Sequence, residues 1–339
     1  MSGMTVGEIG EFGLIAALEA ALPEGVRSGG GVRLSIGDDC ALWETTPGEL
    51  VVITTDSLVE DVHFRLDWTG WEDLGHKTLA VNLSDLASMG ARAGVAVVTL
   101  ALRGTELVDD LVRLYRGMGA LAARTGTQIV GGDIVRSPAA TAFHITALGE
   151  TRGGRALRRD GARAGDVVLV SGTLGASAAG LRLLGEDPSS PRRRATTAGL
   201  LLDAHRRPEP RLALGAALLA GGATAAMDLS DGLLGDLPKI LQRSGVTAMI
   251  DEGLVPVAAA VRALYPDDRL ELAMRGGEDY ELLVTAPPER VAALQEAAQG
   301  LGLDLTAIGE VRAAGGPLLT LRSVGVERVA VAGAFDHFG

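Results

Sequence analysis

Apolar residues recur along this chain at two spacings, one typical of helices and one typical of strands. Those of residues 11–22 fall on one helical face, whereas the runs at 50–55 (LVVITT) and 94–102 (GVAVVTLAL) favour strands. The same reasoning predicts helices over 71–89, 105–124, 176–184, 212–219, 233–244 and 289–298, and strands over 128–130, 142–148, 167–171, 225–229, 247–251, 280–285 and 305–311. We expect Thr105 to cap the helix that follows it. This mixture of elements predicts an α/β (α+β) fold.

One segment interrupts the periodicity. Residues 151–165 (TRGGRALRRDGARAG) hold five arginines and four glycines in fifteen residues, which is typical of a domain junction. A chain of 339 residues is long enough for two domains, each with its own core. We therefore expect an N-terminal α/β domain at 1–150 and a C-terminal α/β domain at 151–339, with an exposed loop at 186–197.

Charge and composition exclude several classes of protein. Asp and Glu number 43 against 31 Lys and Arg, a net charge of −12, so a bulk positive charge for nucleic acid or membrane surfaces is absent. The single cysteine, Cys40, cannot form an intrachain disulfide, a zinc ribbon or an iron–sulfur cluster. The longest uncharged stretch, 212–227, is shorter than the roughly 20 apolar residues of a membrane helix. We expect a cytoplasmic protein with no nucleic-acid or membrane partner.

The familiar nucleotide and nucleophile motifs do not occur. Residues 70–78 are similar to a P-loop, but His76 separates the last glycine from Lys77, and the motif needs lysine directly after that glycine. Neither G-x-G-x-x-G after a strand nor G-x-S-x-G is present. P-loop, Rossmann and acyl-transfer chemistry therefore have no support. We expect His76 and Lys77 to face the surface of their helix, away from any chemistry.

Carboxylates beside glycines recur where predicted strands end or helices begin. They are Asp38 and Asp39, Asp56, Asp85, Asp133, Asp228 and Asp231, and Glu278 with Asp279. Each alone has an ordinary explanation as a turn, a helix N-cap or a solvated helix face. Together they predict a polycarboxylate site at the edge of a sheet, where ligands commonly bind. Mg²⁺ prefers such oxygen ligands and bridges them to substrate phosphates, with Thr54 and Thr55 as further oxygen donors.

Longer motifs carry a resemblance that spans nearly the whole chain. They are IGDDCAL (36–42), TTDSLVEDVHF (54–64), HKTLAVNLSDLASMGA (76–91), VGGDIVRS (130–137), MDLSDGLLGDL (227–237), GGEDYELL (276–283) and FDHF (335–338). Together these motifs resemble the thiamine-monophosphate kinase family, in the superfamily of aminoimidazole-ribotide synthetase and selenophosphate synthetase. The resemblance implies that superfamily's two-domain fold and ATP-dependent phosphorylation of thiamine monophosphate to thiamine diphosphate. It also implies several Mg²⁺ ions and a homodimer in which the N-terminal sheet pairs with its mate.

The resemblance also implies roles for individual residues. The magnesium ligands would be Asp39, Thr54, Thr55, Asp56, Asp85, Asp133, Asp228 and Asp231. ATP would be bound by Tyr115, Gly132, Asp133, Arg159 and Ser230, and thiamine monophosphate by His63, Glu278 and Phe335. The family often has Trp or Tyr at position 335, so phenylalanine keeps ring stacking and loses a ring hydrogen bond. No nucleophile or general base is assigned.

Several of these residues have a second interpretation. Tyr115 lies in the middle of a predicted helix, where an aromatic side chain often belongs to the core, and His63 could be an ordinary loop histidine. We expect Cys40 to be a small buried residue. The function also has alternatives: another ATP-using member of the superfamily, similar to aminoimidazole-ribotide synthetase, or a regulator that binds nucleotide and cations without catalysis.

The expected mechanism is direct in-line transfer of the γ-phosphoryl group. The acceptor is a phosphate whose second pKa is about 6, so it is largely dianionic and needs no strong base. The obstacle is electrostatic, because two like unit charges 4 Å apart repel by about 4 kcal/mol at an effective dielectric of 20. Several Mg²⁺ ions would relieve this repulsion and orient the groups.

Overall fold

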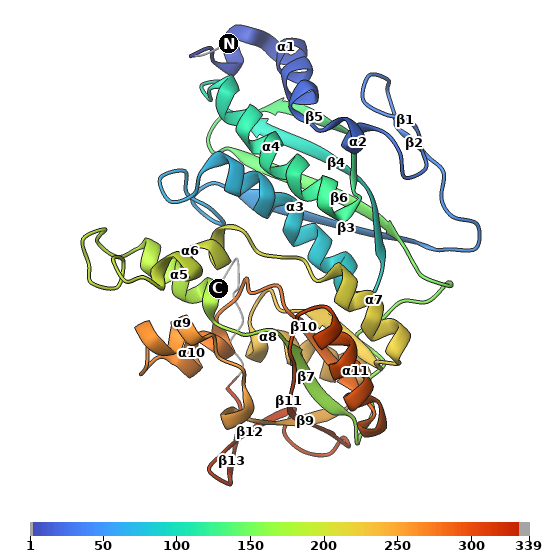
Figure 1. Ribbon diagram of the computed structural model, residues 1–339, viewed down its shortest axis with the longest axis vertical. Coiled ribbons are helices and arrows are strands. Elements are labelled where there is room, and N and C mark those ends of the chain that lie inside the picture. The colour runs from blue at the N-terminus through green and yellow to red at the C-terminus, as the bar shows by residue number, and fades with distance from the viewer. Residues whose placement is uncertain (1–2, 332–339) are drawn as a thin grey trace. The chain divides into compact units, whose positions relative to one another are not determined.

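The computed structural model describes residues 3–331 and divides into two compact units (Figure 1). Of the described residues, 3–86 and 92–154 form the N-terminal unit, and 87–91 and 155–331 form the C-terminal unit. Each unit combines helices with a sheet, which confirms the predicted fold class. In the part of the chain that the structure describes, no helix has the length and apolar character needed to span a bilayer.

The N-terminal unit is built around a four-stranded sheet. Its elements are α1 (Val6–Ala21), α2 (Glu24–Arg27), β1 (Val32–Leu34), β2 (Leu42–Trp43), β3 (Val51–Val59), α3 (Trp71–Ser88), β4 (Arg92–Leu102), α4 (Val108–Thr125), β5 (Gln128–Arg136) and β6 (Ala142–Glu150). The sheet order is β3–β6–β4–β5, with β4 and β5 parallel and the other neighbours antiparallel. The short strands β1 and β2 form a separate pair.

Helices cover one face of this sheet. α3 and α4 lie along that face (Figure 1), where Leu100 and Ile145 are fully buried. Successive side chains of a strand point to opposite faces, so Ser57, Thr99 and His144 lie on the other face, and they are exposed or half-buried. This alternation is typical of an antiparallel sheet with one face on the core. It also explains why these strands tolerate polar residues along their whole length.

The C-terminal unit contains a seven-stranded sheet of order β13–β12–β9–β11–β7–β10–β8. Its elements are β7 (Val167–Ser171), α5 (Ala176–Leu184), α6 (Ala198–Arg206), α7 (Leu212–Gly221), β8 (Ala225–Asp228), α8 (Leu233–Ser244), β9 (Thr247–Asp251), η1 (Glu252–Leu254), α9 (Ala259–Leu264), α10 (Arg269–Arg275), β10 (Leu282–Ala286), α11 (Pro288–Gly300), β11 (Leu305–Arg312), β12 (Leu319–Ser323) and β13 (Val326–Val329). Val170 packs in one apolar cluster and its neighbour Leu169 in another, because both faces of the sheet are covered. This accounts for the continuous apolar run in β7.

Four predicted elements of the C-terminal unit agree with the structure at both ends. β7, α5, α8 and β9 occupy the predicted residues, and no helix or strand interrupts 186–197. The predicted Thr105 cap is wrong, because α4 begins at Val108 with Leu107 at its N-cap position. The Glu106 carboxylate instead accepts the N–H groups of Arg103 and Gly104, so the chain turns before the helix begins.

Candidate active site

Two of the predicted metal ligands meet in the N-terminal unit. Asp56 on β3 and Asp85 on α3 lie close enough for Asp85 to act on the Asp56 carboxyl, and the hydroxyl of Thr54 donates a hydrogen bond to Asp85 Oδ2. The pKa of Asp56 is raised from 3.8 to about 6, mainly by burial of its carboxyl group and to a smaller extent by the charge of Asp85. Three oxygen-bearing side chains therefore converge on the helix-covered face of the sheet. Two carboxylates and a hydroxyl form a donor set that suits a hard cation such as Mg²⁺.

Other predicted ligands lie on the opposite face of the same sheet. Thr55 Oγ1 donates to the Ile145 carbonyl at 3.0 Å, and its side chain points away from that of Thr54 because adjacent strand residues alternate. Asp133 on β5 is exposed and lies in register with Thr99 of β4, which pairs with His144 of β6. The described chain thus brings Thr54, Asp56 and Asp85 together, and it places Thr55 and Asp133 on the open face.

Two aspartates were expected at strand ends and lie inside strands. β3 runs to Val59 and β5 runs to Arg136, so Asp56 and Asp133 both fall within a strand. The expectation was wrong because the open face of the sheet lets strands continue through polar and glycine residues. Gly132 has a packing reason: a Cβ there would lie 1.9 Å from the Val98 carbonyl oxygen of β4. Its role in ATP binding stays a prediction.

The loops before and after β3 carry further predicted residues. Asp39 is exposed, and its N–H donates to the Oδ1 atom of the preceding residue, Asp38, at 2.8 Å. Cys40 beside it is exposed, so the expectation of a buried filler was wrong. The Nδ1 atom of His63 accepts the Val59 N–H at 3.1 Å, which fixes the imidazole against the end of β3.

Three polar side chains are buried in helices of the N-terminal unit. His76 and Lys77 of α3 are only 3% and 2% exposed, which contradicts the expectation that they face solvent. The expectation was wrong because nearly every side chain of α3 from Leu74 to Ser88 is buried, so this part of the helix has no solvent-facing side. Tyr115 of α4 is 7% exposed, and burial raises the pKa of its hydroxyl. This placement agrees with the core interpretation of Tyr115, while its contact with ATP stays a prediction.

In the C-terminal unit the two acidic motifs pack backbone against backbone. The N–H of Glu278 donates to the Ser230 carbonyl at 2.8 Å, and the N–H of Tyr280 donates to the Leu229 carbonyl at 2.9 Å. A Cβ at Gly277 would lie 2.4 Å from the Ser230 oxygen, so this approach requires glycine. The loop after β8 and the loop before β10 therefore lie against each other. These two loops and the end of β8 carry four predicted residues, namely Asp228, Ser230, Asp231 and Glu278.

Sequence reasoning missed the cation at this site. Lys239 Nζ lies 2.6 Å from Asp231 Oδ2 and 2.8 Å from Asp236 Oδ1, and the Asp236 side chain is fully buried. Burial raises the pKa of the Asp236 carboxyl, although Lys239 opposes that effect. The i, i+3 spacing of Asp236 and Lys239 on a helix was the available signal. Any cation at Asp231 therefore meets a carboxylate that already binds an ammonium group.

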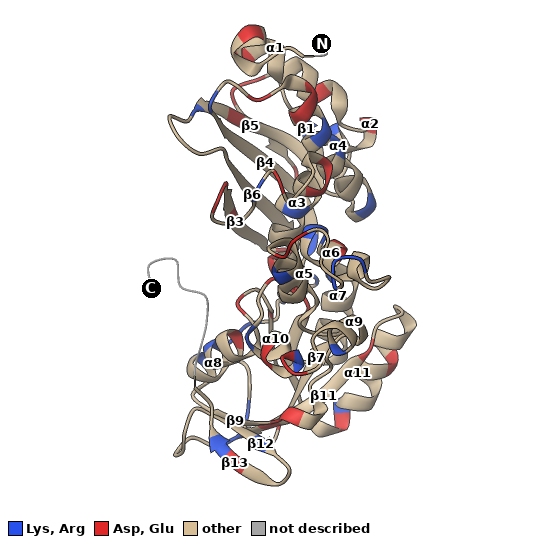
Figure 2. Cartoon of the chain, turned by 90° about the vertical axis from the view of Figure 1, so that its left-hand side faces the viewer, with Lys and Arg blue, Asp and Glu red and all other residues tan. Residues whose placement is uncertain are grey.

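The last predicted residues lie elsewhere. The Arg159 side chain is exposed, and its carbonyl accepts from Ser244 Oγ at 2.8 Å. Phe335 lies outside the described residues. Within 3–331 no three His, Cys, Asp or Glu side chains are grouped as a metal-binding set. Acidic residues occur on elements of both units, as Figure 2 shows.

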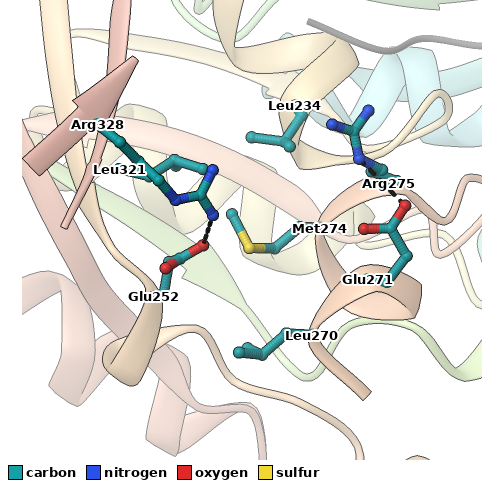
Figure 3. A pocket seen from close by; sticks show the side chains of 8 residues that line it. All are labelled: Leu234, Glu252, Leu270, Glu271, Met274, Arg275, Leu321 and Arg328. Atoms are coloured by element: carbon teal, nitrogen blue, oxygen red, sulfur yellow. Dashed lines mark hydrogen bonds and ion pairs between the residues drawn. The ribbon is translucent and has the colours of Figure 1, made fainter. Parts of the chain in front are cut away.

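A cavity of about 350 Å³ opens in the C-terminal unit (Figure 3). The lining residues are Leu234, Glu252, Leu270, Glu271, Met274, Arg275, Leu321 and Arg328. Arg328 forms an ion pair with Glu252 at 2.5 Å, and Arg275 forms one with Glu271 at 3.1 Å. Both guanidinium groups are thus neutralised, so the cavity is a poor phosphate site, and it contains none of the predicted site residues.

Comparison with known proteins identifies the two units. The AIR synthase related protein, N-terminal domain, matches residues 37–151, and the C-terminal domain of the same family matches residues 163–321. Thiamine-monophosphate kinase of Escherichia coli is 41% identical over 90% of this chain and 91% of its own length. The Bacillus subtilis enzyme of that name is 34% identical over 91% of this chain and 94% of its own length.

Solved structures agree with the sequence comparison. The crystal structure of thiamine-monophosphate kinase from Stenotrophomonas maltophilia has a TM-score of 0.81 at 39% identity, covering 92% of this chain and 96% of that one. A structure described as AaThiL complexed with AMPPCP and TMP has a TM-score of 0.72 at 34% identity, covering 95% of this chain and 96% of that one. The chain therefore belongs to the thiamine-monophosphate kinase family of AIR synthase related proteins.

Proposed function

We propose that this protein uses ATP to phosphorylate thiamine monophosphate, giving thiamine diphosphate. Relatives that carry the name thiamine-monophosphate kinase match most of the chain at 34% and 41% identity. The similar AaThiL structure is described with AMPPCP, an ATP analogue, and with TMP. Both comparisons support a kinase with these two substrates.

One observation within the structure supports the proposal most directly. Asp56 and Asp85 place two carboxylates together on one face of a sheet, at a cost that shows in the raised pKa of Asp56. A half-buried pair of like charges is typical of a functional site, since a stable fold alone does not need it. A bound cation would offset the repulsion, and the same cation would attract phosphate groups to this acidic protein.

The residues present fit magnesium. Asp56, Asp85 and the hydroxyl or carbonyl of Thr54 would hold it in the N-terminal unit, with Asp39, Thr55, Asp133, Asp228 and Asp231 as the remaining proposed ligands. Magnesium supplies charge neutralisation between ATP and the acceptor phosphate when it is bound. We propose that several Mg²⁺ ions bind.

The protein's own contribution is to position the two phosphate-bearing substrates. We propose in-line transfer to a phosphate oxygen of the acceptor, which is already dianionic near neutral pH and needs no general base. Gly132, Ser230, Arg159 and Tyr115 are the proposed ATP contacts, and His63, Glu278 and Phe335 are the proposed contacts to thiamine monophosphate. The Glu278 and Ser230 loops are mutually fixed by a backbone hydrogen bond of 2.8 Å.

The division of labour between the units is also part of the proposal. The N-terminal domain (1–150) would bind metal and ATP and form a homodimer, and the C-terminal domain (151–339) would complete the active site. The open face of the β3–β6–β4–β5 sheet supports the dimer, because Ile53 on that face is 65% exposed. We place the protein in the cytoplasm, in keeping with its single cysteine.

To test the function, the protein is incubated with ATP, Mg²⁺ and thiamine monophosphate, and thiamine diphosphate is detected by chromatography. Formation of that product supports the proposal. ATP binding in equilibrium dialysis without any product would identify a regulator, and product from free thiamine alone would identify a different kinase. Turnover of ATP with an aminoimidazole-ribotide precursor would favour the other enzyme of the superfamily.

A further inference from the structure

Glu278 lies in a backbone loop that is strained and held from one side by a helix. Glu278 and Tyr280 both have left-handed backbone angles, with φ of 65° and 51°, which non-glycine residues rarely adopt. Between them, the Asp279 carboxylate accepts the N–H groups of Gly175 at 2.7 Å and Ser177 at 3.1 Å, at the start of α5. Such strain persists only where surrounding contacts determine it, and it is concentrated at ligand sites.

A buried histidine holds the same loop from the neighbouring helix. His205 of α6 has a side chain that is 6% exposed, and its Nδ1 atom lies 3.3 Å from Glu278 Oε2. The same Nδ1 atom lies 3.1 Å from the Oγ atom of Ser177, and the backbone N–H of Ser177 donates to Asp279. An ionised carboxylate can only accept, so a favourable contact requires the proton on Nδ1. His205 therefore connects Glu278 to the helix that already holds Asp279.

Glu278 remains accessible on its other side. Its side chain is 27% exposed, whereas His205 is almost fully enclosed. The Glu278 side chain is thus partly enclosed by protein and partly open to solvent. A carboxylate held in this manner suits a ligand with N–H donors or a positive charge. Thiamine monophosphate has both, an amino group on its pyrimidine ring and a cationic thiazolium ring.

We propose that His205 is a positioning residue for the acceptor substrate, which fixes the Glu278 carboxylate toward the amino or cationic part of thiamine monophosphate. This inference rests on the proposed function and extends it to a residue outside the acidic motifs. His205 does not contact the transferred phosphoryl group. Its loss should weaken binding of the acceptor and leave ATP binding unchanged.

Three substitutions at one position separate positioning from packing. His205→Leu fills the site without a donor, His205→Asn places an amide N–H near the position of Nδ1, and His205→Gln places it near that of Nε2. We expect His205→Leu and His205→Gln to raise the KM for thiamine monophosphate about tenfold, the size expected for a lost hydrogen bond to a charged group. His205→Asn should retain a KM within about twofold of the parent, and the KM for ATP should not change in any of the three.

Leu201→Ala is the matched control, because Leu201 lies on the same helix and is 1% exposed. It should lower the melting temperature and leave both KM values unchanged. Glu278→Gln alone and combined with His205→Leu completes a double-mutant cycle, in which the double variant should bind thiamine monophosphate no more weakly than Glu278→Gln alone.

Isothermal titration with thiamine monophosphate, without ATP, gives a second readout that is independent of turnover. Additive losses in the cycle, equal effects on both KM values, or a His205→Asn variant as impaired as His205→Leu would overturn the positioning role. If His205→Leu does not fold, the comparison of His205→Asn with His205→Gln decides by itself. A parent protein that binds and phosphorylates no thiamine monophosphate would overturn the proposed function itself, and this inference with it.

Discussion

Removing one charge from the Asp56–Asp85 pair should stabilise the metal-free protein while it abolishes turnover. The substitution Asp56→Asn keeps the shape of the side chain and removes its charge. Raising the pKa of Asp56 from 3.8 to about 6 corresponds to about 3 kcal/mol of unfavourable free energy in the ionised folded state. Burial accounts for the larger share and Asp85 for the smaller, so Asp85→Asn should recover about 1 kcal/mol.

The sign of the pH dependence follows from the same pKa. Between pH 3.8 and about 6 the carboxyl of Asp56 is ionised in the unfolded chain and protonated in the folded one, so stability falls as pH rises and levels off above about 6. The gain from Asp56→Asn should therefore be about 3 kcal/mol at pH 8 and about 1 kcal/mol at pH 4.5.

Tryptophan fluorescence reports on the relevant unit alone. The three tryptophans are Trp43, Trp68 and Trp71, all in the N-terminal unit. Urea unfolding in EDTA, followed by this signal at both pH values, measures the change. Asp133→Asn is the control, because Asp133 lies exposed on the open face, and it should change stability by less than about 0.5 kcal/mol. Equal or lower stability of Asp56→Asn at pH 8, or a gain that does not depend on pH, would refute the reasoning.

Three further predictions concern packing, charge and metal. Gly132→Ala should destabilise the N-terminal unit by about 3 kcal/mol in the same fluorescence assay, because its Cβ would lie 1.9 Å from the Val98 carbonyl oxygen. The control Gly131→Ala should change stability little, because its Cβ would lie 3.6 Å from a Val97 methyl group. Lys239→Met should destabilise the C-terminal unit by about 2 kcal/mol, because it leaves the buried Asp236 carboxylate without the Lys239 ammonium group. Urea unfolding followed by circular dichroism measures the loss, and adding Asp236→Asn to the same chain should restore most of it. Chelation by EDTA should stop ATP turnover and excess Mg²⁺ should restore it, whereas a rate unchanged by chelation would contradict a role for the metal.

The sequence predicted best the helices and strands that the spacing of nearby apolar residues determines. β7 is a continuous apolar run because both faces of its sheet are covered, and α5 and α8 have apolar residues at helical spacing. These three elements and β9 were placed at their observed residues. The sequence grouped Asp228 and Asp231 with the other motif aspartates in one polycarboxylate site, which stays a prediction, and it did not show that the backbones of Ser230 and Gly277 approach each other.

The sequence predicted less well which face of the sheet a side chain points to, and which residues far apart in the chain come into contact. Thr54 and Thr55 are neighbours in sequence and point to opposite faces of a sheet, and which face is covered depends on helices that follow much later. His205 and Glu278 are 73 positions apart, and no spacing rule links them. Lys239 was missed, because the partners that determine its role lie one turn away on its helix and across the loop.

The most direct test of the central claim is a magnesium titration of thiamine diphosphate formation from ATP and thiamine monophosphate. The account predicts product formation that depends on Mg²⁺ in the parent protein and a rate at least a hundredfold lower for Asp85→Asn, by analogy with the loss of one charge-stabilising group, while urea unfolding shows that this variant is folded. Near-normal product formation by folded Asp85→Asn, or no product from the parent protein at saturating Mg²⁺, would contradict it.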